Sequence, residues 1–228
     1  MIQTSKATTL ALQRAEATSL LLFEAIESNN LIVAGKTEAQ LVAEINELAL
    51  KEFGINNHWH KKIVRTGINT LAIYREDPQD RMIQPDDILF IDLGPIVNGY
   101  EADLGRTYVL GHDANKLKLK RDVEEAWYEI QAAYQASSHL RASDLFQMAV
   151  EKAHEYGWVF SGEIAGHIVG EYPHEQPLVP TSLELDIHPD NHNDIFLPDA
   201  HENRRHWILE LQFVDREKGI GGYFEQLL

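Results

Sequence analysis

The stretch that decides the fold runs from Ile88 to Gly111 and reads ILFIDLGPIVNGYEADLGRTYVLG. Two segments rich in β-branched and apolar residues flank the dipeptide Asn98-Gly99. Asn-Gly is the strongest short-range hairpin signal, because a type I′ turn needs positive φ at both central residues. The stretch therefore predicts two antiparallel strands joined at Asn98-Gly99.

This hairpin places two aspartates close together. Pairing outward from the turn sets Asp92 opposite Gly105, and side chains alternate between the faces of a sheet. Asp92 and Asp103 then become diagonal neighbours on one face. Two carboxylates so close repel each other and do not both stay ionised without a compensating cation. The pair predicts a site for divalent metal.

Residues that would complete such a site lie downstream. His167 and His174 stand seven residues apart in a segment punctuated by Gly and Pro. Glu210 lies in an alternating apolar stretch, and Glu225 lies in the apolar run that ends the sequence. An unpaired charge at a buried strand position is costly, so these acids need a partner. Four carboxylates and one imidazole suit two divalent ions with a bridging hydroxide between them.

Five of these residues, taken in order, resemble the metal-ligand set of the M24 metallopeptidases, the family of methionine aminopeptidase, aminopeptidase P and prolidase. They are Asp92, Asp103, His167, Glu210 and Glu225. Residues 54–60 and 64–70 are more similar to the aminopeptidase P and prolidase branch, and the resemblance runs from about Ala15 to the end. It implies a pseudo-duplicated α+β "pita-bread" fold, with a curved antiparallel sheet inside and helices outside. Residues 1–228 are expected to form one domain, closest to a stand-alone Xaa-Pro peptidase-like catalytic domain.

The resemblance also implies how the ligands share two ions. Asp92 would chelate one ion, Asp103 and Glu225 would bridge both, and His167 with Glu210 would hold the other. Ligation rich in oxygen favours manganese, with cobalt, iron or zinc as alternatives. The expected activity is a dinuclear exopeptidase that removes an N-terminal residue, an Xaa-Pro end being one candidate, through the metal-bridging hydroxide.

Catalytic and substrate residues follow from the same resemblance, and here the sequence also departs from it. Glu210 is the expected proton shuttle, and His174 is expected to contact substrate and stabilise the oxyanion. Tyr74 occupies the place of a substrate-binding histidine, while Glu163 and Tyr223 replace a histidine and an arginine of the aminopeptidase P branch. Specificity for a proline bond is therefore not implied.

Two alternatives remain beside the enzyme. One is a non-catalytic peptide- or protein-binding module that retains the peptidase fold, which the replacement at Tyr74 favours. The other is a metal-free hydrolase of the amidino or creatine type, against which the intact ligand set counts.

Composition narrows the partners. The 228 residues are 44% hydrophobic, enough for one sizeable core. A net charge of −16 argues against nucleic acid and against an anionic membrane surface as partner. The family resemblance implies a peptide substrate. Cysteine is absent from the sequence, so thiol catalysis and disulfides are excluded. No secretory signal and no apolar run of membrane-spanning length is recognised, and a cytoplasmic protein is expected.

Four helices are expected from apolar spacing and end signals. The first covers residues 7–28. The second begins at a capping box on Thr37 and stops at Gly54. The third carries apolar residues at helical spacing over 119–134, and the fourth is opened by Ser143 and ended by Gly157.

Three further segments carry open interpretations. Residues 178–206 predict a long loop. His58 and His60 flank Trp59; on a strand they would share one face, and on a loop neither would need to approach the site. The apolar run 20–23 is core or an oligomer contact, and the second reading leaves a homodimer open.

Overall fold

The computed structural model describes residues 2–177, 179 and 181–228. Its elements follow the expected order of two helices and strands, then two helices and strands again. They are α1 (Ile2–Ser28), α2 (Glu38–Phe53), β1 (Ile63–Thr66), the 3-10 helix η1 (Gly67–Leu71), β2 (Ile88–Leu93), β3 (Ile96–Val97), β4 (Tyr100–Glu101), β5 (Leu104–Val109), α3 (Ala114–Ala136), α4 (Ala142–Tyr156), β6 (Val159–Phe160), β7 (Ile168–Val169), β8 (His206–Asp215) and β9 (Ile220–Leu227).

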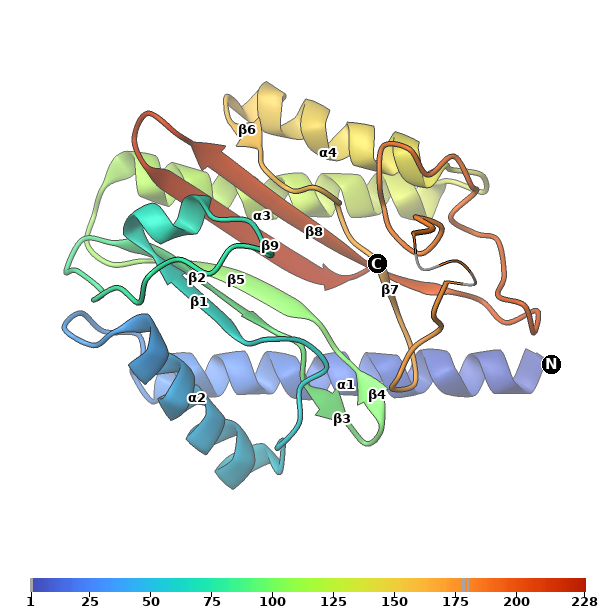
Figure 1. Ribbon diagram of the computed structural model, residues 1–228, viewed down its shortest axis with the longest axis horizontal. Helices are drawn as coiled ribbons and strands as arrows, with labels where there is room; N and C mark the ends of the chain where they lie inside the picture. Colours follow the sequence, from blue (N-terminus) through green and yellow to red (C-terminus); the bar gives the residue numbers. More distant parts are fainter. Residues whose placement is uncertain (1, 178, 180) are drawn as a thin grey trace.

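A twisted antiparallel sheet forms the middle of the molecule. Its strand order is β1-β2-β5-β9-β8-β6, with β7 paired to β8 beside this path. In Figure 1, α1 and α2 lie below β1 and β2, α3 passes behind β8 and β9, and α4 lies above them. One apolar cluster joins α1 and α2 to β2, and a second joins α3 and α4 to β8 and β9. The β5–β9 pair therefore joins two halves of similar construction, as an α+β pseudo-duplication requires.

The predicted hairpin is present. Asn98 and Gly99 have φ of 52° and 83°, the positive values that a type I′ turn needs. Asp92 lies opposite Gly105, which confirms the register predicted from the sequence. The tip of the hairpin, β3 and β4, forms a separate two-stranded ribbon beyond the main sheet.

Two predicted helix starts differ from the structure, and the other predicted ends follow local chemistry. The helix expected over residues 7–28 ends at Ser28 as expected but begins earlier, at Ile2. Thr37 forms the predicted capping box, and Gly54 ends α2 in the left-handed region at φ 67°. Gly157 likewise ends α4 at φ 85°. The predicted start of α4 at Ser143 is wrong by one residue, because Arg141 is the N-cap and makes no side-chain capping bond. The first N–H groups of α4 instead donate to backbone carbonyls of the long loop, Ala142 to Asn193 at 3.0 Å and Ser143 to Asn191 at 2.8 Å.

Two other expectations are resolved by burial and connectivity. Leu22 and Phe23 are buried in the apolar cluster that joins α1 and α2 to β2, although Leu21 is exposed. Most of the run 20–23 therefore belongs to the core. Between Val169 and His206 the described residues form no helix or strand, which confirms the long loop; it ends where β8 begins at His206. None of the described helices combines the length and apolarity needed to cross a membrane.

Candidate metal centre and active site

Carboxylates from three strands form a row across the sheet. Asp92 on β2 lies opposite Gly105 on β5, Gly105 lies opposite Glu225 on β9, and Glu225 lies opposite Glu210 on β8. Directly paired residues project to the same face, so the three acids converge. Gly105 keeps the row open, because a Cβ there would lie 2.3 Å from the ring of Tyr223.

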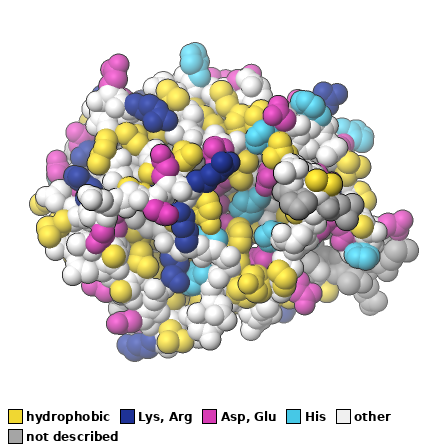
Figure 2. All heavy atoms as spheres, in the orientation of Figure 1, with side chains coloured by type: hydrophobic (Ala, Val, Ile, Leu, Met, Phe, Trp, Pro, Cys, Tyr) yellow, Lys and Arg dark blue, Asp and Glu magenta, His cyan; other side chains and the backbone are white. Residues whose placement is uncertain are grey.

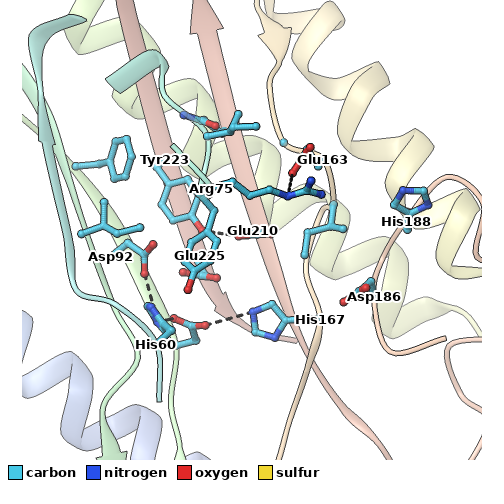
Figure 3. A pocket seen from close by; sticks show the side chains of 18 of the residues that line it. His60, Arg75, Asp92, Glu163, His167, Asp186, His188, Glu210, Tyr223 and Glu225 are labelled. Carbon is cyan, nitrogen blue, oxygen red and sulfur yellow. Dashed lines mark hydrogen bonds and ion pairs between the residues drawn. The ribbon is translucent and has the colours of Figure 1, made fainter. Parts of the chain in front are cut away.

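Asp103, one residue before β5, completes the cluster between two histidines. His60 Nε2 lies 3.0 Å from Asp103 Oδ1, and His167 Nε2 lies 3.3 Å from Asp103 Oδ2. His60 Nε2 is also 3.6 Å from Asp92 Oδ1. In Figure 3 the two imidazoles approach the acids from opposite sides, His60 beneath Asp92 and His167 from the segment before β7. The structure thus brings together all five predicted metal-ligating residues, since Glu210 and Glu225 line the same pocket.

The donor set fits divalent cations. Asp92 Oδ1 and Glu225 Oε2 are buried and lack a hydrogen-bond partner among the described residues. Buried charged oxygens of this kind require a partner, and a cation supplies one. Two groups have ligand atoms that all lie within 4.8 Å of one another: His60 with Asp92 and Asp103, and Asp103 with His167 and Glu225. Because the groups share Asp103, the site suits two ions side by side.

Burial and mutual charge perturb the titration of this cluster. Burial raises the pKa of Asp92 to about 7 and raises that of Glu225 well above its ordinary value, with neighbouring carboxylates adding to both shifts. Burial acts in the same direction on Asp103, but His60 and His167 hold its pKa at about 2. Burial alone would lower the pKa of both imidazoles, yet the acids raise it to about 10 for His60 and about 9 for His167.

His174 is held beside the cluster by a buried acid. Its Nδ1 lies 2.8 Å from Oε2 of Glu101, a residue only 1% exposed. The same carboxylate accepts the backbone N–H groups of Gly170 at 3.0 Å and of His174 at 3.1 Å. The ring of Trp59 meets the His174 ring edge to face at 5.5 Å. These contacts fix the His174 imidazole and leave its Nε2 for the pocket.

The residues that depart from the family pattern also line this pocket. Tyr74 is 53% exposed at the mouth, where a substrate could contact it. The hydroxyl of Tyr223 donates to Oε2 of Glu210 at 2.5 Å, so the residue in place of the arginine contacts a candidate catalytic acid. Glu163 forms an ion pair with Arg75 at 2.8 Å, visible beside the cluster in Figure 3.

Sequence reasoning missed His60 as a member of the site. The segment around Trp59 is a loop, as one interpretation had it, but it enters the site instead of staying away from it. Two hydrogen bonds of Trp59 hold this loop in place. Its backbone N–H donates to the Gly94 carbonyl at 2.9 Å, and its Nε1–H donates to the Ala102 carbonyl at 3.0 Å. The signal that could have found it is that this loop leads directly into β1, whose first residue pairs with Asp92.

The cluster forms the floor of a cavity of about 490 Å³. Figure 2 shows the hollow near the centre of one face, with histidine side chains inside it and basic side chains beside it. An open pocket over buried carboxylates and imidazoles that share ligand atoms is typical of a hydrolytic metal centre.

The chain belongs to metallopeptidase family M24, which its residues 10–199 match. It is 28% identical over 116 residues to a methionine aminopeptidase of Clostridium acetobutylicum, a match covering 50% of this chain and 46% of that protein. It is 30% identical over 151 residues to an Xaa-Pro dipeptidase of Pyrococcus furiosus, covering 65% and 42%. The chain thus spans about half the length of these relatives or less.

The fold is shared with solved members of the family. The X-Pro aminopeptidase of Thermotoga maritima superposes with a TM-score of 0.76 at 23% identity, over 96% of this chain and 57% of that one. The pita-bread fold expected from the ligand order is therefore confirmed, including its mostly antiparallel sheet and outer helices.

Proposed function

We propose that residues 1–228 act as one catalytic domain, a metal-dependent exopeptidase that removes an N-terminal residue from peptides. The observation that carries this proposal is the acid cluster at the floor of an open pocket, in which the buried oxygens Asp92 Oδ1 and Glu225 Oε2 accept no hydrogen bond from the described residues. A fold that needed only stability would place apolar side chains there, because buried unpaired charge is destabilising.

The proposed ligands are those of the family pattern. Asp92 would hold one ion, His167 with Glu210 would hold the second, and Asp103 and Glu225 would serve both. Manganese is proposed because most of these donors are oxygens, and cobalt, iron and zinc are the alternatives. When bound, the ions would supply Lewis acidity and lower the pKa of an attacking water.

Two residues of the chain are proposed to handle proton and charge during hydrolysis. Glu210 takes the proton of the attacking water, and the hydroxyl of Tyr223 on its Oε2 keeps the carboxylate turned toward the pocket. His174 donates from Nε2 to the oxyanion that develops on the scissile carbonyl, while Glu101 holds Nδ1. Loss of such an oxyanion donor costs about 2.7–4 kcal/mol of transition-state stabilisation in other enzymes.

Substrate choice is proposed at the mouth of the pocket. Tyr74 contributes a hydroxyl where the family pattern has an imidazole, and the Arg75–Glu163 pair offers both charges beside it. The relatives are named for both methionine and Xaa-Pro ends. We therefore propose a short unblocked peptide as substrate, with the residue preference set by these pocket side chains.

The test combines metal content with a substrate panel. Protein purified without chelator should hold close to two divalent ions, and Asp103→Ala should lose both, because its carboxylate lies in both donor groups. Peptides with free Met-Ala and Xaa-Pro ends should be cut only at the first bond, with metal dependence, and N-acetylated copies should be inert. Absence of metal after manganese supplementation, or cleavage of internal bonds, would refute the proposal.

A second candidate is a peptide-binding module that keeps the fold and metal without catalysis. The replacement at Tyr74 favours it, because a phenol does not titrate as an imidazole does near neutral pH. This second function would be established if the metal-loaded protein cleaves none of the panel peptides but binds them saturably in calorimetry.

A further inference from the structure

His60 stands in the acid cluster but outside the five-residue ligand pattern. Its Nε2 lies 3.0 Å from Asp103 Oδ1 and 3.6 Å from Asp92 Oδ1. His167, which belongs to the pattern, lies on the other oxygen of the same carboxylate, 3.3 Å from Asp103 Oδ2. The two oxygens of Asp103 therefore each have one imidazole beside them. Figure 3 shows His60 and His167 on opposite sides of the acid cluster.

The two imidazoles are oriented by the same local device. His60 Nδ1 lies 2.7 Å from the carbonyl oxygen of Lys61, and His167 Nδ1 lies 2.9 Å from that of Ile168. A proton on Nδ1 that is donated to the carbonyl leaves Nε2 as the nitrogen directed at the acids. Metal-ligating histidines are oriented in this way by the hydrogen bond of their other nitrogen.

Gly94 and Trp59 set the position of the His60 ring. A Cβ on Gly94 would lie 2.0 Å from Cδ2 and 2.2 Å from Nε2 of His60, so the ring fits only because residue 94 is glycine. The Trp59 ring packs edge to face against His60 at 4.6 Å and is anchored on the Ala102 carbonyl. The His60 side chain is only 6% exposed. A mobile surface histidine would have none of these contacts.

We propose that His60 is a further ligand, binding through Nε2 the ion that Asp92 and Asp103 hold, so that each of the two ions has one imidazole. This inference rests on the dinuclear site of the proposed function. An added nitrogen donor favours zinc, cobalt or iron over manganese at this position, since imidazole suits those ions better than carboxylate oxygen alone does. It also takes a coordination position that would otherwise be open to water or substrate.

Proton NMR of the cobalt(II)-loaded protein tests the ligand count without using activity. A histidine bound to cobalt(II) through Nε2 shows one exchangeable Nδ1–H resonance shifted far outside the diamagnetic range. Two such resonances are expected from the wild type, and His60→Ala should remove one. Gly94→Ala should remove the same resonance, because the added methyl group displaces the His60 ring while every ligand residue is kept. It is therefore a second test that does not depend on the folding of His60→Ala.

Two matched controls should keep both resonances. His58→Ala removes a neighbouring imidazole whose ring nitrogens are buried without a hydrogen-bond partner among the described residues. Gly170→Ala adds a methyl group beside the site, where the nearest atom, His174 Cβ, is at an ordinary 3.4 Å. Circular dichroism of every variant should match the wild type.

Metal affinity gives a second readout. In calorimetric titrations, His60→Ala should weaken zinc binding at one of two sites by at least about 10–100-fold, the range seen when groups around a metal site are removed. Manganese binding should change less. Two bound cobalt ions with a single shifted Nδ1–H in the wild type would overturn the inference and leave the proposed function standing. Failure to bind cobalt, zinc and manganese alike would overturn both.

Discussion

Glu101 offers the sharpest test of how the pocket is organised. Its buried carboxylate accepts three hydrogen bonds, from His174 Nδ1 and from the backbone N–H groups of Gly170 and His174. Glu101→Gln keeps the shape but replaces one acceptor oxygen by an NH₂ group, which can only donate. Whichever way the amide turns, one N–H in this pocket faces another donor.

The magnitude follows from the hydrogen bonds that change. Bonds to a charged acceptor contribute about 1.5–3 kcal/mol, against about 1 kcal/mol for neutral ones, and a buried unsatisfied group costs a further 1–3 kcal/mol. We expect Glu101→Gln to lower the free energy of unfolding by about 2–4 kcal/mol. If displacement of the His174 ring raises the activation free energy by about 1.4–2.7 kcal/mol, kcat falls about 10–100-fold.

The assay compares two variants with the same chemical change. Glu175 accepts two hydrogen bonds from Arg205, at 2.7 and 2.9 Å, but its side chain is 31% exposed. Glu175→Gln should cost less than about 1 kcal/mol in urea unfolding and leave kcat unchanged. Glu101→Gln should lower kcat with KM and metal content close to wild type. If Glu101→Gln is destabilised but turns over like Glu175→Gln, Glu101 has only a structural role and the proposed part of His174 is wrong.

Three further predictions concern the sheet, the pH dependence of stability and the pocket mouth. Gly105→Ala should displace the ring of Tyr223 and cost about 1–3 kcal/mol in urea unfolding, as overpacking does; unchanged stability would mean that the strand absorbs the methyl group. Burial lowers the pKa of His206 to about 4, so the stability tied to its neutral form is complete above about pH 6.5 and is lost as the pH falls toward 4. Between pH 7 and 5 this loss is about 2 kcal/mol, and His206→Gln should flatten the unfolding profile by that amount; a parallel profile would contradict the assignment. Burial raises the pKa of Tyr74 above its usual 10, so its hydroxyl stays protonated at neutral pH and can donate a hydrogen bond to substrate. Tyr74→Phe removes this one hydrogen bond and should raise KM about 2–10-fold. Tyr74→His should add an ionisation to the acidic limb of the pH–rate profile, and wild-type behaviour of both variants would make Tyr74 a packing residue.

Local chemistry in the sequence was enough for the parts of the fold that involve neighbouring residues. The Asn98-Gly99 turn sets the register that brings Asp92 opposite Gly105, because positive φ at both positions permits one tight turn. The capping box at Thr37 and the glycine at 54 set the ends of α2 in the same way. Ligand order, read through the family resemblance, supplied the pita-bread fold and the candidate acids.

Tertiary structure alone decided which distant groups meet. Glu225 reaches the aspartates only because β9 pairs with β5, a contact between strands more than a hundred residues apart that no local pattern encodes. Glu101 is buried because the segment of Gly170 folds onto it. His60 lies on a loop without periodicity, and its place depends on the space left by Gly94. Such positions are set by packing and hydrogen bonds between residues far apart in the sequence. Hydrophobic periodicity reports only on neighbouring residues and so does not predict them.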